Sequence, residues 1–191
     1  IEHDLYANTS NPARVRSRSR LTAAYGGVPS PDAQKVIMTP VTLGAEPLIN
    51  VVRRVALERG DALAVDELTY AELWRQTARV AGRLAERGVV RGDRVAIYSE
   101  NRRGFVLAYL ALLRLGAIAV PTNVLYRAAD LGNILSDATP RLVVGSAQTR
   151  PHVPAEMPFV DAADIEAWAV DPALPGTFDD IPVEPDDVAI M

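Results

Sequence analysis

Cysteine, lysine and histidine, three residue types that enzymes use for nucleophilic and base chemistry, are scarce in this sequence. There is no cysteine, and every basic residue except Lys35 is an arginine or one of two histidines. The missing cysteine excludes disulfides, thiolate nucleophiles and cysteine-ligated zinc. His3 and His152 lie far apart, and neither has a metal-ligand neighbour at helical spacing. A mechanism that needs a lysine must use Lys35 or obtain one from elsewhere.

Arginine rows and paired acids are the remaining candidates. Arg75, Arg79 and Arg83 recur every four residues and could bind an anion, but like charges at this spacing are typical of a solvated helix face. The acids at 179–180 and at 186–187 are adjacent in sequence. Adjacent residues of an extended chain point to opposite faces, so these acids are poor general acid–base pairs. We expect both pairs to lie in surface turns.

The spacing motifs of common enzyme sites are absent. The sequence has no G-x-x-x-x-G-K-[ST] loop, no G-x-G-x-x-G after a strand, no G-x-S-x-G and no H-E-x-x-H. The net charge of −4 argues against nucleic acid as the main partner. The residues alone therefore predict a buried scaffold without an evident catalytic group.

Periodic apolar residues predict helices and short strands in alternation. Helical spacing covers 48–59 and 69–87, where Thr69 and Glu72 have the pattern of a capping box and Gly88 is a helix stop. The elements expected next are a strand at 92–99, a buried helix with Asn101 as N-cap and Gly116 as stop, a strand at 117–123, a helix at 128–140 and a strand at 141–146. This order predicts an α/β fold, a mostly parallel sheet flanked by helices.

The two ends of the sequence have a different character. Residues 1–41 are rich in Ser, Pro, Gly and Arg without an apolar period, and we expect a flexible leader. The apolar run at 105–113 is shorter than the roughly 20 residues of a membrane span, and no signal peptide is evident, so we expect a cytoplasmic protein. Prolines after residue 171 predict a surface crossing, before "DVAIM" at 187–191 begins a buried strand.

Five segments in order give the sequence a specific resemblance. They are "LTYAEL" at 68–73, "GDRVAI" at 92–97, Asn101 before an apolar helix, "LRLGAIAVPTN" at 113–123 and "RLVV" at 141–144. Together they resemble the beginning of the adenylate-forming superfamily, which contains acyl-CoA synthetases, adenylation domains of peptide synthetases and luciferases. The resemblance covers residues 45–147, with a weaker continuation to 191.

The resemblance implies that residues 42–191 are the N-terminal portion of an AMP-binding large domain, an incomplete subdomain that stops before the phosphate loop. In the family, a segment like "DDVAIM" leads into a Ser/Thr/Gly-rich loop that holds the phosphates of ATP. The implied reaction joins a carboxylic acid to ATP, with magnesium, and passes the acyl group to coenzyme A. The family places its catalytic groups further along the chain. We therefore expect no catalytic residue, metal ligand or bound cofactor here, and no activity from this chain alone.

The resemblance also implies a place where coenzyme A enters. It lies at the segments after "VPTN" and after "RLVV", where Arg127 and Arg150 could pair with the phosphates of coenzyme A, because arginine forks fit phosphate oxygens. The sequence departs from the family here: "NVLYRAADL" replaces the common Asn-Pro-Arg pattern, and Arg127 is a poor N-cap. The local geometry near this mouth therefore stays open.

Three alternatives remain beside an acyl-CoA synthetase. The first is an adenylation domain that feeds a carrier protein, and the second is a non-catalytic α/β binding module. The third is a nucleotide-dependent oxidoreductase, against which the missing glycine fingerprint counts. We also expect an uncovered strand edge and apolar surface near "DDVAIM", and with them self-association.

Overall fold

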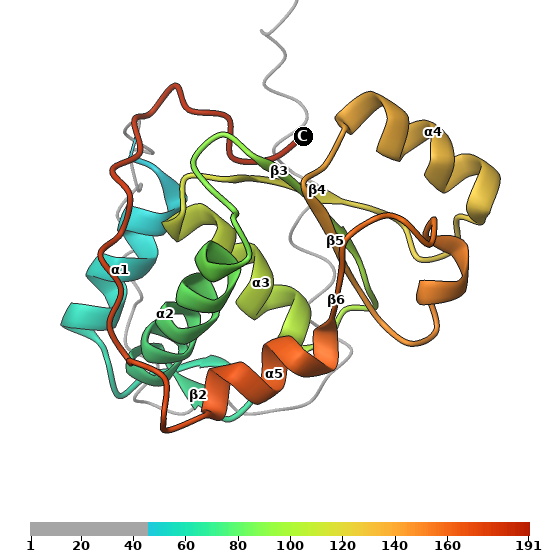
Figure 1. Cartoon of the computed structure of the whole chain (residues 1–191). Helices are drawn as coiled ribbons and strands as arrows, with labels where there is room; N and C mark the ends of the chain where they lie inside the picture. The colour runs from blue at the N-terminus through green and yellow to red at the C-terminus, as the bar shows by residue number, and fades with distance from the viewer. Residues whose placement is uncertain (1–45) are drawn as a thin grey trace, which may run out of the picture. The chain divides into compact units, whose positions relative to one another are not determined.

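The computed structural model describes residues 46–191 (Figure 1). The leader expected at 1–41 lies outside the described residues. In chain order the described elements are α1 (Leu48–Glu58), β1 (Leu63–Val65), β2 (Leu68–Thr69), α2 (Tyr70–Glu86), β3 (Arg94–Tyr98), α3 (Arg103–Arg114), β4 (Ile118–Pro121), α4 (Ala128–Ala138), β5 (Leu142–Gly145), the 3-10 helix η2 (Arg150–His152), β6 (Phe159–Asp161) and α5 (Ala162–Val170). No helix in this part of the chain is long and apolar enough to cross a membrane.

Four parallel strands form the central sheet, in the order β4-β3-β5-β6. Strand β3 lies in the middle, where Val95 is in register with Ala119 on one side and Leu142 on the other. Strand β6 follows β5 at the far edge. The predicted α/β class with a parallel sheet is confirmed. The antiparallel pair β1–β2 is a separate small hairpin.

Helices cover both faces of this sheet (Figure 1). Helices α1, α2, α3 and α5 pack on one face and α4 on the other, each over its own buried cluster. Strand β3 serves both clusters because its side chains alternate: Val95 and Ile97 point to α3, and Ala96 and Tyr98 point to the face that α4 covers. The connection from β3 to β4 and the connection from β4 to β5 run in opposite directions along the sheet. Because both are right-handed, their helices α3 and α4 lie on opposite faces.

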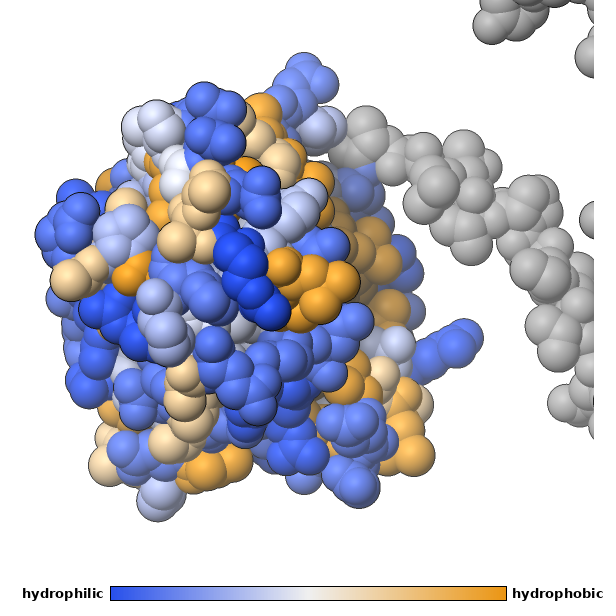
Figure 2. Space-filling model, turned by 90° about the vertical axis from the view of Figure 1, so that its right-hand side faces the viewer, coloured by the Kyte–Doolittle hydropathy of each residue, from blue (hydrophilic) through white to orange (hydrophobic). Residues whose placement is uncertain are grey.

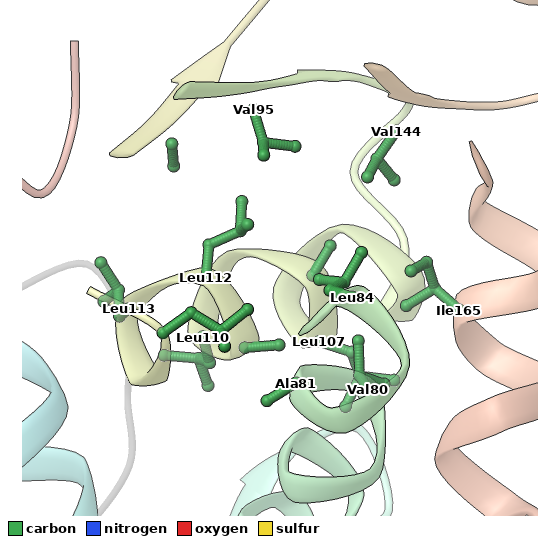
Figure 3. Close-up of a cluster of buried hydrophobic side chains, with 14 of the residues drawn as sticks. Val80, Ala81, Leu84, Val95, Leu107, Leu110, Leu112, Leu113, Val144 and Ile165 are labelled. Carbon is green, nitrogen blue, oxygen red and sulfur yellow. The ribbon is translucent and has the colours of Figure 1, made fainter. Parts of the chain in front are cut away.

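The larger core lies between the sheet and helices α2, α3 and α5. Val95 and Val144 point down from the strands toward Leu112 and Leu84, and Ile165 closes the side from α5 (Figure 3). All five side chains are fully buried. Burying each of them contributes about 1.5–3 kcal/mol, so this layer is the main source of stability. The prediction of a helix buried on more than one side is confirmed for α3.

The N-terminus of α2 is capped by residues next to it in sequence, whereas that of α3 is capped by a distant residue. The predicted capping box is present: the Thr69 hydroxyl accepts from the Glu72 amide at 3.3 Å, and the Glu72 carboxylate accepts from the Thr69 amide at 2.9 Å. The prediction that Asn101 caps the next helix is wrong, because α3 begins at Arg103 without a side-chain bond from its N-cap residue. The carboxylate of Glu166 instead accepts from the Gly104 amide at 2.9 Å. A negative group there also favours the helix dipole.

Residues 171–191, here called the C-terminal segment, return from α5 to the sheet without forming a helix (Figure 1). Arginine side chains hold this segment by donating to its backbone carbonyls: Arg79 to Leu174 at 3.2 Å, Arg91 to Pro182 at 2.8 Å and Arg114 to Phe178 at 3.3 Å. The predicted surface crossing is confirmed. The prediction that the arginine row is a solvated helix face is wrong for Arg79, which also donates to the Ala169 carbonyl at 2.8 Å.

Arg114 is the most deeply buried of these arginines, with 2% of its side chain exposed. It pairs with Asp180 at 2.5 Å, donates to the Trp74 carbonyl at 2.7 Å and lies 3.8 Å from the centre of the Trp74 ring. Burial lowers the pKa of Arg114, and its bond to Asp180 opposes that shift. The expectation of a surface-turn acid is therefore wrong for Asp180, which is partly buried and lies outside any turn. The expectation is confirmed for Asp187, which lies in an exposed turn and there pairs with Arg91 at 2.6 Å.

The last residues reach the open edge of β4. Ile190 forms a single parallel bridge to Ala119. The Ala119 amide donates to the Ala189 carbonyl at 3.0 Å, and the Ala119 carbonyl accepts from the Met191 amide at 3.0 Å. The strand expected at "DVAIM" is thus begun, but it is not buried: Val188 is 57% exposed and Ile190 is 54% exposed. On the face seen in Figure 2, hydrophobic residues form small groups separated by hydrophilic ones. Self-association stays a prediction.

Candidate functional site

Polar residues follow directly after the three longest strands of the sheet. Ser99 and Glu100 come after β3, Thr122 after β4 and Ser146 after β5. Because the strands are parallel, these residues meet at one edge, formed by the carboxyl ends. Ligands of open α/β sheets bind at this edge, where neighbouring connections diverge. We call this set the carboxyl-edge site.

The connections diverge beside β3. The chain after β3 turns into α3, on the face of the larger core. The chain after β4 turns into α4 on the opposite face, and the one after β5 runs through η2, whose following Val153 packs in the same smaller cluster as α4. A hollow of about 400 Å³ lies where these paths separate, between the ends of β3 and β4. Its lining includes Ser99, Glu100, Asn101, Pro121, Thr122 and Asn123.

Hydrogen bonds fix the polar groups of this edge. The Ser146 hydroxyl donates to the Glu100 carboxylate at 3.1 Å, which ties the end of β5 to the end of β3. The Ser146 amide donates to the Thr149 hydroxyl at 2.8 Å, forming a tight turn after β5. Ser99, Thr122, Ser146 and Thr149 are all buried. The edge is therefore a rigid, hydroxyl-lined surface with one carboxylate, suited to receiving a polar ligand rather than to acid–base chemistry alone.

Tyr98 links this edge to the segment that carries Arg127. Its buried hydroxyl donates to the Tyr126 carbonyl at 2.5 Å, one residue before Arg127. Burial raises the pKa of Tyr98, and the charge of Arg127 opposes that shift, so the phenol stays protonated and able to donate. The backbone before α4 is thereby fixed to the end of β3.

The structure brings the segments of Arg127 and Arg150 together. A guanidinium nitrogen of Arg127 lies 3.4 Å from Nε2 of His152, in the short helix that Arg150 begins. Arg127 is exposed at the N-terminus of α4, which has no side-chain cap, in agreement with the poor N-cap seen in the sequence. Arg150 is turned away: it donates to the Pro154 carbonyl at 3.3 Å and lies over the Phe159 ring at 4.9 Å.

A metal centre does not fit the described residues. Within 46–191 no group of three or more His, Cys, Asp or Glu side chains could hold a metal ion. Sequence reasoning named Arg127 and Arg150 but missed Glu100, Ser146 and Thr149. The available signal was their position, since each lies at or shortly after the carboxyl end of a predicted buried strand, where parallel sheets bind ligands.

Comparisons with known proteins place this fold. The model of the AMP-binding enzyme family matches residues 52–191. A probable non-canonical nonribosomal peptide synthetase, CymA, from Salinispora arenicola is 32% identical over 133 residues, which are 68% of this chain and 2% of that protein. The peroxisomal OPC-8:0-CoA ligase 1 of Arabidopsis thaliana is 32% identical over 124 residues, 61% of this chain and 23% of that protein.

A solved structure agrees with the sequence matches. The N-terminal domain of FACL13 from Mycobacterium tuberculosis superimposes with a TM-score of 0.68 at 23% identity, over 76% of this chain and 40% of that one. The chain thus spans only part of the length of the relatives it matches. The ordered motifs, the parallel sheet and the family match over 140 of 191 residues, counted from 52 to 191, agree with one another. The chain belongs to the AMP-binding enzyme family.

Proposed function

We propose that this chain is the N-terminal part of an ATP-dependent carboxylate–CoA ligase. The carboxylate oxygen attacks the α-phosphorus of ATP, and pyrophosphate leaves as the acyl-adenylate forms. The thiol sulfur of coenzyme A then attacks the acyl carbon, and AMP leaves. The family match over residues 52–191 carries the proposal. The CoA ligase of Arabidopsis among its relatives supports coenzyme A as the acceptor.

The residues of this chain contribute a platform rather than the reacting groups. The parallel sheet and its buried helices make the carboxyl-edge site rigid, and Glu100 and Ser146 fix its strands relative to one another. The sequence has one lysine, Lys35, and no glycine-rich phosphate loop. Cationic side chains and the backbone amides of a phosphate loop are needed to stabilise the charge that develops on the phosphates. We therefore propose that this chain by itself does not form an acyl-adenylate.

We further propose that the segment around Arg127 receives the phosphates of coenzyme A. The Arg127 guanidinium is exposed, and the uncapped amides of the first turn of α4 lie beside it with the positive end of the helix dipole. The His152 ring lies close enough to take part in the same site. Arg150 would have to leave its carbonyl partners to take part, so it supports the η2 turn in the arrangement described here.

An adenylation domain that delivers its acyl group to a carrier protein is the second candidate. The match to the peptide synthetase CymA favours it. The two functions share the first half-reaction and differ in the thiol that attacks the adenylate. They are therefore separated by the acceptor and not by the fold.

The test is ATP–pyrophosphate exchange by the full-length protein with a panel of carboxylic acids. We expect exchange with at least one acid, formation of its CoA thioester on adding coenzyme A, and no exchange from the 191-residue chain alone. Arg127→Gln in the full-length protein should raise the KM for coenzyme A about tenfold without changing exchange, since one charge-assisted contact is lost. Arg59→Gln, a change of the same kind on an exposed residue of another region, is the matched control.

Each outcome has a defined meaning. Exchange without a CoA thioester would assign the carrier-protein function. Absence of exchange with every acid would reject a ligase. An unchanged KM for coenzyme A in Arg127→Gln would reject the place proposed for its phosphates while leaving the ligase reaction intact.

A further inference from the structure

A second hollow lies at the opposite edge of the sheet, where β5 and β6 begin. Its volume is about 540 Å³, within the range of small-molecule sites. The lining consists of two arginines and four apolar residues: Arg87, Arg141, Leu142, Pro158, Phe159 and Val160. Because Leu142 and Phe159 are the first residues of β5 and β6, the hollow is at the amino ends of the strands. It is therefore distinct from the carboxyl-edge site.

Within the described residues, no carboxylate balances the charge of this hollow. Neither Arg87 nor Arg141 has an acidic partner within 4.0 Å among residues 46–191, whereas the neighbouring Arg83 is paired with Glu86 at 2.5 Å. Arg94 is next to Arg141 in the sheet, where its carbonyl accepts from the Arg141 amide at 2.7 Å. This arginine too has no acid among its described partners. Like charges that are close and unbalanced favour binding of an anion.

Contacts within the protein hold the guanidinium of Arg87 in place, and that of Arg141 lies against the turn at Gly88. Arg87 stacks on the ring of Trp168, 4.1 Å from its centre, and donates to the Arg83 carbonyl at 3.1 Å. Arg141 lies against Gly88, where a Cβ atom would be only 2.6 Å from a guanidinium nitrogen. Gly88 has a φ of +80°, so glycine provides both the turn and the room for Arg141. Each guanidinium has five N–H donors, and these contacts leave most of them available.

An apolar wall completes the hollow. Phe159 is half-buried, with the Arg150 guanidinium 4.9 Å from the centre of its ring, and Pro158 is exposed beside it. A ligand here would meet the two arginine side chains together with the apolar surface of the remaining lining residues. Arginine forks suit the oxygens of a phosphoryl group, and the wall suits an aromatic or aliphatic substituent.

We propose that the hollow between Arg87, Arg141 and Phe159 binds a small organic phosphate. Its phosphoryl oxygens accept from the two guanidinium groups, and its apolar part packs against Phe159 and Pro158. No bond is made or broken. The site is independent of the ligase reaction, so it stands or falls separately from the proposed function.

The experiment is calorimetric titration of the 191-residue protein with phenyl phosphate, inorganic phosphate and phenol. We expect phenyl phosphate to bind, inorganic phosphate to bind about tenfold more weakly and phenol not to bind measurably. Arg87→Gln and Arg141→Gln should each weaken phenyl phosphate about tenfold, and the double variant should abolish binding. The double variant Arg59→Gln with Arg75→Gln removes the same charge from exposed arginines elsewhere and should bind normally.

A further variant separates the two halves of the site. Phe159→Leu should weaken binding of phenyl phosphate but leave binding of inorganic phosphate unchanged. If the glutamine variants do not fold, Arg87→Lys removes the guanidinium fork while keeping the charge, and it should also weaken binding of phenyl phosphate. Equal loss of binding in the Arg59/Arg75 control would show that only overall charge matters and would overturn the site. Absence of phenyl phosphate binding to the parent chain, or equal affinity for the two phosphates, would overturn the assignment to an organic phosphate.

Discussion

Removing the two members of the Arg114–Asp180 pair should have unequal effects on stability. The side chain of Arg114 is 2% exposed and that of Asp180 is 24% exposed. Asp180→Ala leaves a buried cation without its acid, whereas Arg114→Met leaves a carboxylate that water can reach. Loss of one partner from a buried pair is costly mainly because of the unpaired charge left behind. We therefore expect the aspartate substitution to be the more damaging of the two.

The hydrogen bonds of the pair set the sizes of the two effects. In Asp180→Ala, Arg114 keeps the Trp74 carbonyl at 2.7 Å and the Thr77 hydroxyl at 3.2 Å as acceptors, so we expect a loss of about 3 kcal/mol, at the lower end for a buried charge. In Arg114→Met, the Trp74 carbonyl keeps a bond from the Thr77 hydroxyl at 3.0 Å, and methionine fills most of the volume. About 1 kcal/mol should be lost, and the double variant should resemble Arg114→Met.

Urea unfolding measures both free energies, and amide hydrogen exchange locates the effect. The Ile181 amide donates to the Arg114 carbonyl at 2.9 Å, so it reports opening of the C-terminal segment. A loss of about 3 kcal/mol corresponds to about a hundredfold faster exchange where a rapid opening equilibrium sets the rate. Asp179→Ala is the matched control, because Asp179 is the exposed neighbour of Asp180. Equal losses in Asp180→Ala and Arg114→Met, or a larger loss in Arg114→Met, would refute this reasoning.

Two further predictions concern helix ends. Thr69→Ala removes the side-chain half of the capping box of α2 and should lower the free energy of unfolding by about 1 kcal/mol in urea titration, while Thr69→Ser keeps the hydroxyl and should restore most of it. Hydrogen bonding from Arg102 lowers the pKa of Glu166 from its ordinary value of 4.5, so its stabilising contribution is present above that pH and is lost as the pH falls through the lowered value. Glu166→Gln should therefore be less stable than the parent near neutral pH. The difference in stability, measured by thermal unfolding, should shrink below about pH 4.5. A difference that is constant with pH would contradict a stabilising role for the ionised Glu166 carboxylate.

Local patterns predicted most of the scaffold correctly. The capping box at Thr69 and the apolar strand at Val95 depend on residues within a few positions, and both are present. The N-terminus of α3 was predicted wrongly because its cap is Glu166, 62 residues away in sequence from Gly104. Asn101 is a good cap by type, but tertiary structure supplies a better one. No local signal encodes that choice.

The candidate site was less predictable than the scaffold. The part of the sequence near Arg127 and Arg150 was identified through resemblance, and the structure brings their segments together through His152. The contact between Glu100 and Ser146 depends on β3 and β5 being neighbours, although β4 and α4 separate them in the chain. Strand order decides such contacts. Apolar periodicity gives the strands but leaves their order undetermined.

The outer side of β4 limits how far a neighbouring backbone can follow it. Ala119 uses both its N–H and its C=O in the bridge to Ile190, and the next residue of β4 that faces the same way is Pro121. Proline has no N–H to donate, so a ladder that begins at Ala119 loses one rung two residues later. Any backbone laid along this side must diverge or accept a missing bond there, which favours a short contact over a long continuous strand.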